Sequence, residues 1–592
     1  MQYTCRIEHG KIIATLTPDR DLTAPILCFS GIGPMTVTAG GIPVGGLGSF
    51  TEVALPDLTA GAPHNVTIEY THGHSAKNRA WLPIGPYLKV DGDAVPLPFD
   101  AGGCVPQVLP DLGPVDGLAL VPQPSNHAMT GTVVEISGVD CKDDALAAVS
   151  DLAKRRGWAF SGTFPVTIKP AEMADDAYRL EITPNGIQIS ASSYGGRFYA
   201  GVTLLTLMRH GPVPCGIIED APRFSWRGQH LDTARHYYQP QTILELLDLM
   251  ALLKMNRFHW HFADDEAFRL QIDSFPELWQ KTEKCGVGQL LPGLFTGSLV
   301  SGGSYSKDTA RQIIAHAAAL NIEVLPEIEA PAHAIAITHV YPDTRDPADN
   351  GAERSVQGYR GNALNPAMPK TWEVLEGIAK EVGDLFPFGH LHLGCDELPA
   401  DTWLGSPKAR ELMADEKLET TDDLQGWMMS RLAAKVVENG QRPAAWEEAA
   451  KGSNGGIGNG AILFSWTGQG PGLDAARAGY DVVMSPAQHV YLDMAHTDDV
   501  DDWGAGWAAA VGLADTIDWN PVPDPTLSDR IIGIQSTFWS EFTTHDSQLW
   551  PMLMPRMLGV AVKAWQNADM AANDLSRLAV CYQDIWPVEA SE

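Results

Sequence analysis

A repeating pattern of hydrophobic and polar positions runs from residue 223 to the end of the chain. Each repeat has a short apolar run, a loop with polar or aromatic residues, and an amphipathic segment. In residues 241–254 and 308–320 the apolar side chains return with the period of an α-helix that buries one face. The short apolar runs predict eight strands, at residues 227–234, 256–264, 322–330, 390–397, 442–448, 461–466, 481–486 and 532–541.

Eight strands that alternate with helices predict an α/β fold, a (β/α)8 TIM barrel, which we assign to residues 221–592. The alternative is an open, doubly wound sheet. Such a sheet usually carries a Gly-rich phosphate-binding loop, and the sequence contains none. In a TIM barrel the functional residues gather where the strands end, so the strand ends are the place to look for chemistry.

Two smaller domains precede the predicted barrel. Residues 1–115 are rich in Gly, Pro and Thr and carry short alternating runs, which is typical of a β-sandwich. Because this region lacks a cluster of titratable residues, we expect an accessory domain that packs against its neighbours or faces carbohydrate. Residues 116–220 predict an α+β companion domain, with strands at 132–136, 178–183 and 186–191 and helices at 144–156 and 195–209.

Composition narrows the range of partners. The 592 residues include 41 Lys and Arg against 73 Asp and Glu, a formal net charge of −32. This excess of negative charge opposes binding to nucleic acid and to anionic lipid, so we expect neither a nucleic-acid partner nor a membrane. Neutral or cationic substrates fit better.

Cysteine usage and the first residues bear on the compartment. The eight cysteines are scattered without a C-x-x-C spacing, so reduced thiols are the simplest interpretation. The N-terminus lacks the basic segment and apolar core of a leader, and no later run is long enough for a membrane span. We therefore expect a soluble cytoplasmic protein.

The most informative stretch is 390–397, with the sequence His-Leu-His-Leu-Gly-Cys-Asp-Glu. Its alternation puts Leu391 and Leu393 on one face of a strand, and Gly394 lets the backbone bend where the strand ends. Asp396 and Glu397 then stand at the carboxyl end of that strand. They could form an acid/base pair or belong to a solvated acidic loop, and this stretch alone leaves both interpretations open.

Other strand ends favour the acid/base interpretation, because they also carry polar and aromatic residues. Carboxylates, an arginine and several tryptophans at one rim are what sugar binding requires, since flat aromatics cover a pyranose and charged groups bond its hydroxyls. The pattern therefore indicates a glycosidase. The residues at the strand ends are Asp232, Arg235, Asp264, Asp265, Glu329, His333, Asp396, Glu397, Trp446, Trp466, Tyr491, Asp493, Trp539 and Glu541.

A metal cluster is another interpretation of part of this set. His259 and His261, with Asp264 and Asp265, have side chains that bind metal ions in other proteins. However, the two histidines share one strand face inside the barrel wall, and isolated clusters of this kind are weak signals. We favour a structural role for both histidines.

Several motifs together resemble glycoside hydrolase family 20, the β-N-acetylhexosaminidases, over residues 116–565. Residues 222–237 resemble the family's first barrel strand, and Phe258-His-Trp-His-Phe-Ala-Asp-Asp resembles its second. Residues 324–333 are similar to the third, and 390–397 to the H-x-G-x-D-E signature of the fourth. The N-terminal sandwich resembles the accessory domain of bacterial chitobiases, and residues 116–220 look like the family's companion domain.

By position, the resemblance implies a set of catalytic roles. Glu397 would be the general acid/base, and Asp396 would orient and polarise the 2-acetamido group of the substrate. Tyr491 would hydrogen-bond the acetamido carbonyl. Asp264 and His333 would form a relay behind Glu397.

The remaining matched residues would bind the sugar. Arg235 would hold its 3- and 4-hydroxyls, while Asp493 and Glu541 would contact its outer hydroxyls. Three tryptophans would enclose the acetamido methyl and the sugar face: Trp446, Trp466 and Trp539.

The sequence departs from the family pattern at four positions, where Cys395, Ala332, Glu329 and Lys563 replace more usual residues. None of these changes removes a matched catalytic group, so they bear on specificity and rate. The resemblance implies a retaining exo-hydrolase that acts on terminal GlcNAc or GalNAc of chitobiose or cell-wall fragments. No cofactor and no metal are expected.

Two hypotheses from other classes stay open. A catalytically silent sugar-binding protein on the same fold would have lost Asp396, Glu397 or Tyr491, and all three are present. A metal-dependent hydrolase using the histidines would lose activity in a chelator. The sequence does not indicate the oligomeric state.

Overall fold

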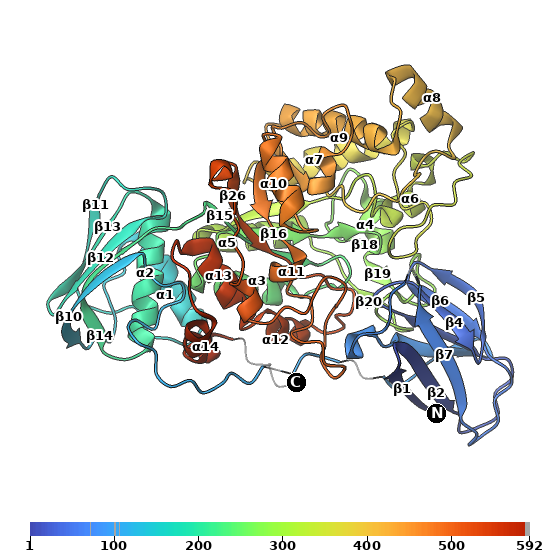
Figure 1. The fold of residues 1–592 in the computed structure, drawn as a ribbon, viewed down its shortest axis with the longest axis horizontal. Coiled ribbons are helices and arrows are strands. Elements are labelled where there is room, and N and C mark those ends of the chain that lie inside the picture. Colours follow the sequence, from blue (N-terminus) through green and yellow to red (C-terminus); the bar gives the residue numbers. More distant parts are fainter. Residues whose placement is uncertain (72, 100–101, 106, 587–592) are drawn as a thin grey trace.

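A computed structural model describes the chain from residue 1 to 586, except residues 72, 100–101 and 106, and leaves residues 587–592 undescribed. The barrel lies in the middle, with the sandwich on one side and the companion domain on the other (Figure 1). Within the described part of the chain, no helix combines the length and apolar character needed to cross a bilayer.

The barrel is closed and parallel, and all eight predicted strands form it in chain order. The last strand pairs with the first, which leaves no open edge. The predicted fold class is thereby confirmed. The strands are β15 (Trp226–Asp232), β16 (Arg257–His261), β21 (Glu323–Glu327), β22 (His390–His392), β23 (Arg442–Trp446), β24 (Ile462–Ser465), β25 (Asp481–Met484) and β26 (Ile531–Ser536).

Several strands end earlier than their hydrophobic pattern predicts. The strand predicted to reach residue 397 ends at His392, and the one predicted to reach 541 ends at Ser536. After β22 the backbone of Gly394, Cys395 and Glu397 has φ values of 66°, 83° and 51°, which no extended strand adopts. Alternation of side chains cannot reveal such a backbone, so the polar residues lie in loops beyond the strands.

Helices cover the outside of the barrel, and the two that were predicted in detail are confirmed as α3 and α5. Both bury one apolar face, as their periodicity indicates. The longest barrel helix, α9, begins at a capping box formed by Thr420 and Asp423. The main barrel helices are α3 (Pro240–Leu252), α5 (Lys307–Ala319), α7 (Pro369–Leu385), α9 (Thr421–Glu438), α10 (Gln469–Arg477) and α13 (Arg556–Trp565).

The companion domain is a mixed five-stranded sheet covered by two helices, as predicted. The hairpin of β12 and β13 forms where the sequence predicts it, whereas β10 begins six residues before the predicted residue 132. Its elements are β10 (Asn126–Val134), β11 (Val166–Pro170), β12 (Tyr178–Thr183), β13 (Gly186–Ala191), β14 (Val213–Asp220), α1 (Asp144–Arg155) and α2 (Tyr194–Arg209).

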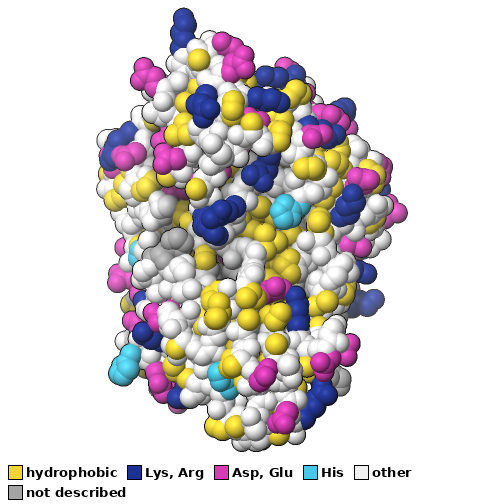
Figure 2. All heavy atoms as spheres, turned by 90° about the vertical axis from the view of Figure 1, so that its right-hand side faces the viewer, with side chains coloured by type: hydrophobic (Ala, Val, Ile, Leu, Met, Phe, Trp, Pro, Cys, Tyr) yellow, Lys and Arg dark blue, Asp and Glu magenta, His cyan; other side chains and the backbone are white. Residues whose placement is uncertain are grey.

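The N-terminal region contains two antiparallel sheets, in the strand orders β1-β2-β7-β4 and β5-β6-β3-β8-β9. On the face of the molecule that carries it, Lys and Arg side chains are interspersed with Asp, Glu and hydrophobic side chains (Figure 2). The strands are β1 (Gln2–Glu8), β2 (Lys11–Thr17), β3 (Ile26–Ser30), β4 (Met35–Ala39), β5 (Ile42–Leu47), β6 (Phe50–Ala54), β7 (His64–Tyr70), β8 (Ile84–Val90) and β9 (Asp93–Pro96).

A buried carboxylate, that of Glu327, holds the histidines inside the barrel. It lies 2.5 Å from Nδ1 of His261 and 2.7 Å from Nδ1 of His392, and it accepts a hydrogen bond from the Trp446 indole at 3.0 Å. His259 lies 3.2 Å from the same carboxylate. Both histidines singled out in the sequence therefore have structural partners within the barrel.

The ion pair between Glu327 and His261 shifts the pKa values of both groups. Burial alone would lower the pKa of His261, but the neighbouring Glu327 raises it to about 10. Burial would likewise raise the pKa of Glu327, whereas His392, His261 and His259 hold it well below its usual value. The carboxylate and His261 are thus both charged at neutral pH and in direct contact.

Glu327→Gln should reduce the free energy of unfolding of the barrel by roughly 3 kcal/mol, because it removes the carboxylate beside Nδ1 of the buried His261 imidazolium and leaves Asp264 as its remaining ion-pair partner. The raised pKa of His261 contributes stability that is fully present below its unfolded pKa and is lost as pH rises through about 10. The difference between variant and wild type should therefore shrink toward that pH. Urea titrations at several pH values measure it.

The matched control is Glu323→Gln, at the other end of the same strand, where the carboxylate is half exposed and pairs with Arg257 at the surface. It should change stability by less than about 1 kcal/mol. Equal effects of the two substitutions would show that Glu327 does not organise the barrel interior.

Candidate active site

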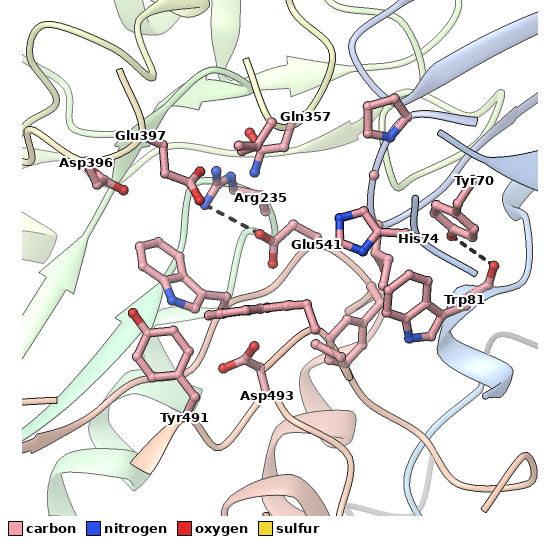
Figure 3. Close-up of a pocket in the computed structure, with 18 of the residues that line it drawn as sticks. Tyr70, His74, Trp81, Arg235, Gln357, Asp396, Glu397, Tyr491, Asp493 and Glu541 are labelled. Atoms are coloured by element: carbon pink, nitrogen blue, oxygen red, sulfur yellow. Dashed lines mark hydrogen bonds and ion pairs between the residues drawn. The ribbon is translucent and has the colours of Figure 1, made fainter. Parts of the chain in front are cut away.

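A pocket of about 250 Å³ opens at the carboxyl ends of the barrel strands. It brings together ten of the eleven site residues predicted from the sequence (Figure 3). The eleventh, Asp264, lies directly behind the pocket and bonds His333. The ten lining residues are Arg235, His333, Asp396, Glu397, Trp446, Trp466, Tyr491, Asp493, Trp539 and Glu541.

Asp264, His333 and Glu397 form a line of hydrogen-bonding groups that leads into the pocket. Oδ1 of Asp264 lies 3.0 Å from Nδ1 of His333, and Nε2 of His333 lies 3.4 Å from Glu397. Burial would lower the pKa of His333, but Asp264 and Asp396 raise it well above its usual value. A charged imidazole therefore stands behind the two neighbouring carboxylates.

The loop that carries Asp396 and Glu397 has an unusual backbone. Gly394 has a φ of 66°, and a β-carbon added there would lie 1.8 Å from the Glu329 carboxylate, so only glycine fits. Cys395 and Glu397 also adopt positive φ, which costs free energy in residues with a side chain. This backbone turns two consecutive side chains into different surroundings.

The two carboxylates differ in exposure. Asp396 is buried, and burial is the main cause that raises its pKa to about 7, with Glu397 adding to the rise and His333 opposing it. The Glu397 side chain keeps 26% of its surface exposed to the pocket. One group is therefore enclosed while the other can reach a substrate atom.

Arg235 is the positive centre of the site. Its guanidinium lies 2.8 Å from Glu266, 2.9 Å from Asp264 and 3.3 Å from Asp232, and 4.0 Å from Glu541. Most of its donors are directed at these carboxylates, so Arg235 holds four acids in place, and its binding of sugar hydroxyls stays a prediction. One contact reaches Glu541 across the pocket (Figure 3).

Aromatic side chains form the rest of the pocket floor. Trp446 and Trp539 have ring centroids 6.0 Å apart, and Tyr491 stacks on Trp466 at 6.4 Å with an interplanar angle of 16°. Trp446 is fixed from below by its bond to Glu327. These flat surfaces suit the apolar face of a pyranose ring.

Two further acids line the pocket opposite Asp396. Burial raises the pKa of Asp493 well above its usual value, and Oδ1 of its carboxylate has no hydrogen-bond partner among the described residues. Burial also raises the pKa of Glu541 to about 7, although Arg235 opposes the shift. Acceptors left without protein partners are suited to bind ligand hydroxyls.

Several contributors were not predicted from the sequence. Glu448 accepts a hydrogen bond from the Trp466 indole at 3.0 Å, and Glu447 accepts one from the Trp466 backbone at 2.8 Å. They directly follow Trp446 at the end of β23, so the strand-end rule could have found them. Trp507, 43% exposed at the mouth, lies on a long loop without a sequence signal.

Asp264, Asp265 and His333 lie close enough together to hold a cation. In this structure, however, Asp264 pairs with Arg235 and bonds His261, and Asp265 accepts a bond from the Ile335 backbone. Protein partners thus occupy most of the ligand atoms that a metal would need.

Comparison with known protein families shows which group of proteins shares this architecture. Residues 224–568 match the glycosyl hydrolase family 20 catalytic domain, and residues 118–221 match domain 2 of the same family. The chain belongs to glycosyl hydrolase family 20. This family 20 enzyme is a glycoside hydrolase, and the resemblance stated from its motifs is confirmed.

Individual relatives agree with this assignment. A β-hexosaminidase of Vibrio furnissii is 35% identical over 68% of this chain and 67% of its own length. An N,N′-diacetylchitobiase of Vibrio harveyi is 29% identical over 76% of this chain and 63% of its own length. The family 20 enzyme therefore has hexosaminidase or chitobiase relatives along most of its length.

Solved structures extend the likeness to the whole chain. A family 20 exo-β-N-acetylglucosaminidase from Vibrio harveyi, crystallised with N-acetylglucosamine, superimposes with a TM-score of 0.87 at 27% identity. The match covers 99% of this chain and 97% of the other. A family 20 β-N-acetylhexosaminidase from Streptomyces coelicolor has a TM-score of 0.66 at 25% identity and covers 80% of this chain and 97% of its own.

Arg235→Lys should raise KM and reduce kcat/KM by at least about tenfold, because a point charge cannot replace the planar fork that reaches several carboxylates and the pocket at once. The free energy of unfolding should also fall, by up to roughly 3 kcal/mol. Steady-state kinetics and urea unfolding measure the two effects.

Arg442→Lys is the control, since Arg442 begins β23 at the far end of the barrel and pairs with Asp481. Its kinetics should match the wild type. Unchanged kinetics for Arg235→Lys would mean that Arg235 neither contacts the substrate nor positions the acids that do.

Proposed function

We propose that this enzyme is a retaining exo-β-N-acetylhexosaminidase that removes terminal, non-reducing GlcNAc or GalNAc from oligosaccharides such as chitobiose or cell-wall fragments. The observation that carries the proposal is the pair Asp396 and Glu397 inside an aromatic pocket, with His333 within 3.4 Å of Glu397.

Glu397 acts as the general acid in the first step. Its partly exposed carboxyl group donates a proton to the glycosidic oxygen while the bond from that oxygen to C1 breaks. In the second step it accepts a proton from the water that attacks C1. The line from Asp264 through His333 holds this carboxyl group in place and adjusts its charge environment.

The substrate's own acetamido oxygen serves as the nucleophile and bonds to C1, as in the substrate-assisted glycosidases. Asp396 stabilises the positive charge that develops on the acetamide, and Tyr491 hydrogen-bonds its oxygen. Water then breaks the new bond from the opposite face, so the configuration at C1 is retained. The buried position of Asp396 strengthens this electrostatic stabilisation, since little water competes with it.

Sugar recognition uses the remaining lining residues. Trp446, Trp466 and Trp539 enclose the acetamido methyl and the ring face, and Arg235 contacts the 3- and 4-hydroxyls from the edge of its carboxylate network. Asp493 and Glu541 accept hydrogen bonds from the outer hydroxyls. Because Asp493 is buried with a raised pKa and its Oδ1 has no hydrogen-bond partner among the described residues, a polar sugar edge supplies the partner that this oxygen lacks in the free enzyme.

A panel of nitrophenyl glycosides and a cyclised thiazoline analogue test the reaction. β-N-Acetylglucosaminides and β-N-acetylgalactosaminides should be hydrolysed, while glucosides and galactosides should be inert because they lack the acetamido nucleophile. The thiazoline should bind at least about 10²-fold more tightly than product, as an analogue of the intermediate. A sugar covalently attached to any carboxylate after fluorosugar treatment, detected by mass spectrometry, would overturn the mechanism.

Glu397→Gln should reduce kcat on oligosaccharides by about 10²- to 10⁴-fold, since glutamine cannot donate a proton to a poor leaving group. Activated aryl glycosides should lose less activity in the same steady-state assay. The control is Glu411→Gln on the exposed helix α8 (Pro407–Glu416), which should behave as wild type. Equal losses on both kinds of substrate would show that Glu397 is not the acid.

A further inference from the structure

The pocket has a wall that does not belong to the barrel. Residues 32–34, Tyr70, Thr71 and His74, all from the N-terminal sandwich, line it together with the catalytic residues. In the close-up, Tyr70 and His74 stand on the opposite side of the pocket from Asp396 and Tyr491 (Figure 3). The accessory domain therefore reaches the place where substrate enters.

The sandwich also supports one barrel loop at the mouth, the loop of residues 353–360. Val356, 53% exposed, and Gln357 line the pocket from this loop. The next residues of the loop touch the sandwich: a β-carbon added at Gly358 would lie 3.0 Å from Pro34, and one added at Gly48 would lie 2.4 Å from the Tyr359 ring. The position of this loop at the pocket mouth therefore depends on the sandwich.

A second loop at the mouth, which carries Trp507, is supported in the same way. Trp507 stands on the loop that follows Asp493, and its ring lies 5.7 Å from that of Trp466. Nε of Arg79 in the sandwich donates to the carbonyl of Asp501 at 2.9 Å, and the Lys77 side chain packs against Gly506. Two loops from different parts of the barrel are thus both held by the N-terminal domain.

The chemistry of this mouth fits a second sugar. With the terminal sugar against Trp446 and Asp396, the leaving sugar must lie further out, beyond Glu397. The exposed ring of Trp507 offers a stacking surface for a pyranose. His74 is exposed, and its imidazole has no hydrogen-bond partner among the described residues, so it is free to bond a hydroxyl.

We propose that the N-terminal sandwich is a component of the substrate site. Through His74, and through the two loops at the mouth that the sandwich supports, it binds the sugar on the leaving side of the scissile bond. The proposal rests on the hexosaminidase activity proposed above and adds a specificity role for a domain outside the catalytic barrel. It predicts that sandwich residues affect substrates that carry a leaving sugar and spare those that do not.

The test compares two substrates with alkyl leaving groups, N,N′-diacetylchitobiose and methyl β-N-acetylglucosaminide. His74→Ala should reduce kcat/KM for the disaccharide by roughly three- to tenfold, the worth of one hydrogen bond. The methyl glycoside should be hydrolysed as by wild type, because it has no second sugar. His74→Gln should restore part of the loss, since its amide can also bond a hydroxyl.

His127→Ala is the matched control, because His127 is an exposed histidine on β10 in the companion domain. It should leave both substrates unaffected. The proposal is overturned if His74→Ala leaves the ratio of the two kcat/KM values unchanged. This holds whether both kcat/KM values equal those of the wild type or both fall by the same factor. If the wild type hydrolyses neither substrate, the proposed hexosaminidase function fails instead.

A second variant tests the wall without removing a hydrogen bond. Gly33 lines the pocket, and its nearest neighbours lie 3.9 Å from the position of an added β-carbon, so a side chain fits there. Gly33→Leu should narrow the mouth and raise KM for the disaccharide by at least about threefold, with the methyl glycoside unchanged. Unaltered KM for the disaccharide would show that the wall does not contact the leaving sugar.

Discussion

The balance of charge around Arg235 is the constraint on which the rest of the site depends. One buried guanidinium lies within 4.0 Å of four carboxylates and supplies positive charge that offsets theirs in the barrel mouth. Each acid also serves another group. Asp264 bonds His333, Glu541 faces the pocket, and Glu266 accepts a hydrogen bond from the Tyr359 hydroxyl at 2.8 Å. Moving the arginine would disturb both the Asp264–His333 pair and the acids that line the pocket.

This network also explains why a distant domain can affect the site. Tyr359 packs against Gly48 of the sandwich and bonds Glu266, which in turn pairs with Arg235. The N-terminal domain is thus connected to the positive centre of the pocket by three consecutive contacts. No pattern in residues 1–115 predicts this connection, because the sandwich lacks a cluster of titratable residues and acts through packing.

A feature could be predicted from the sequence when its own residues carry the signal for it. The eight strands were found because apolar runs such as those of β16 and β24 need only their own residues to be recognised. Ten of the eleven site residues meet in one pocket because a parallel barrel brings its strand ends to one rim. Glu447 and Glu448 were missed although they obey the same rule, since they follow a tryptophan already chosen.

The residues that could not be predicted are those whose positions depend on long-range packing. Tyr70 and His74 reach the pocket only because the sandwich docks on loops hundreds of positions away in the chain. No periodicity or motif in residues 1–115 encodes that docking. Similarly, the early end of β22 depends on backbone angles at Gly394 and Cys395, which side-chain alternation does not report.

The strained loop after β22 solves a problem that two adjacent carboxylates create. If Asp396 and Glu397 shared one environment, repulsion would keep both from being ionised or would hold one proton between them. The positive φ at Glu397 turns its side chain toward the open pocket, while Asp396 stays enclosed near His333. Glu329 fills the space beside Gly394, so this position of the strained loop accepts no side chain. Different surroundings for these neighbouring residues are what the proposed mechanism requires, since in it Glu397 moves a proton while Asp396 stabilises charge.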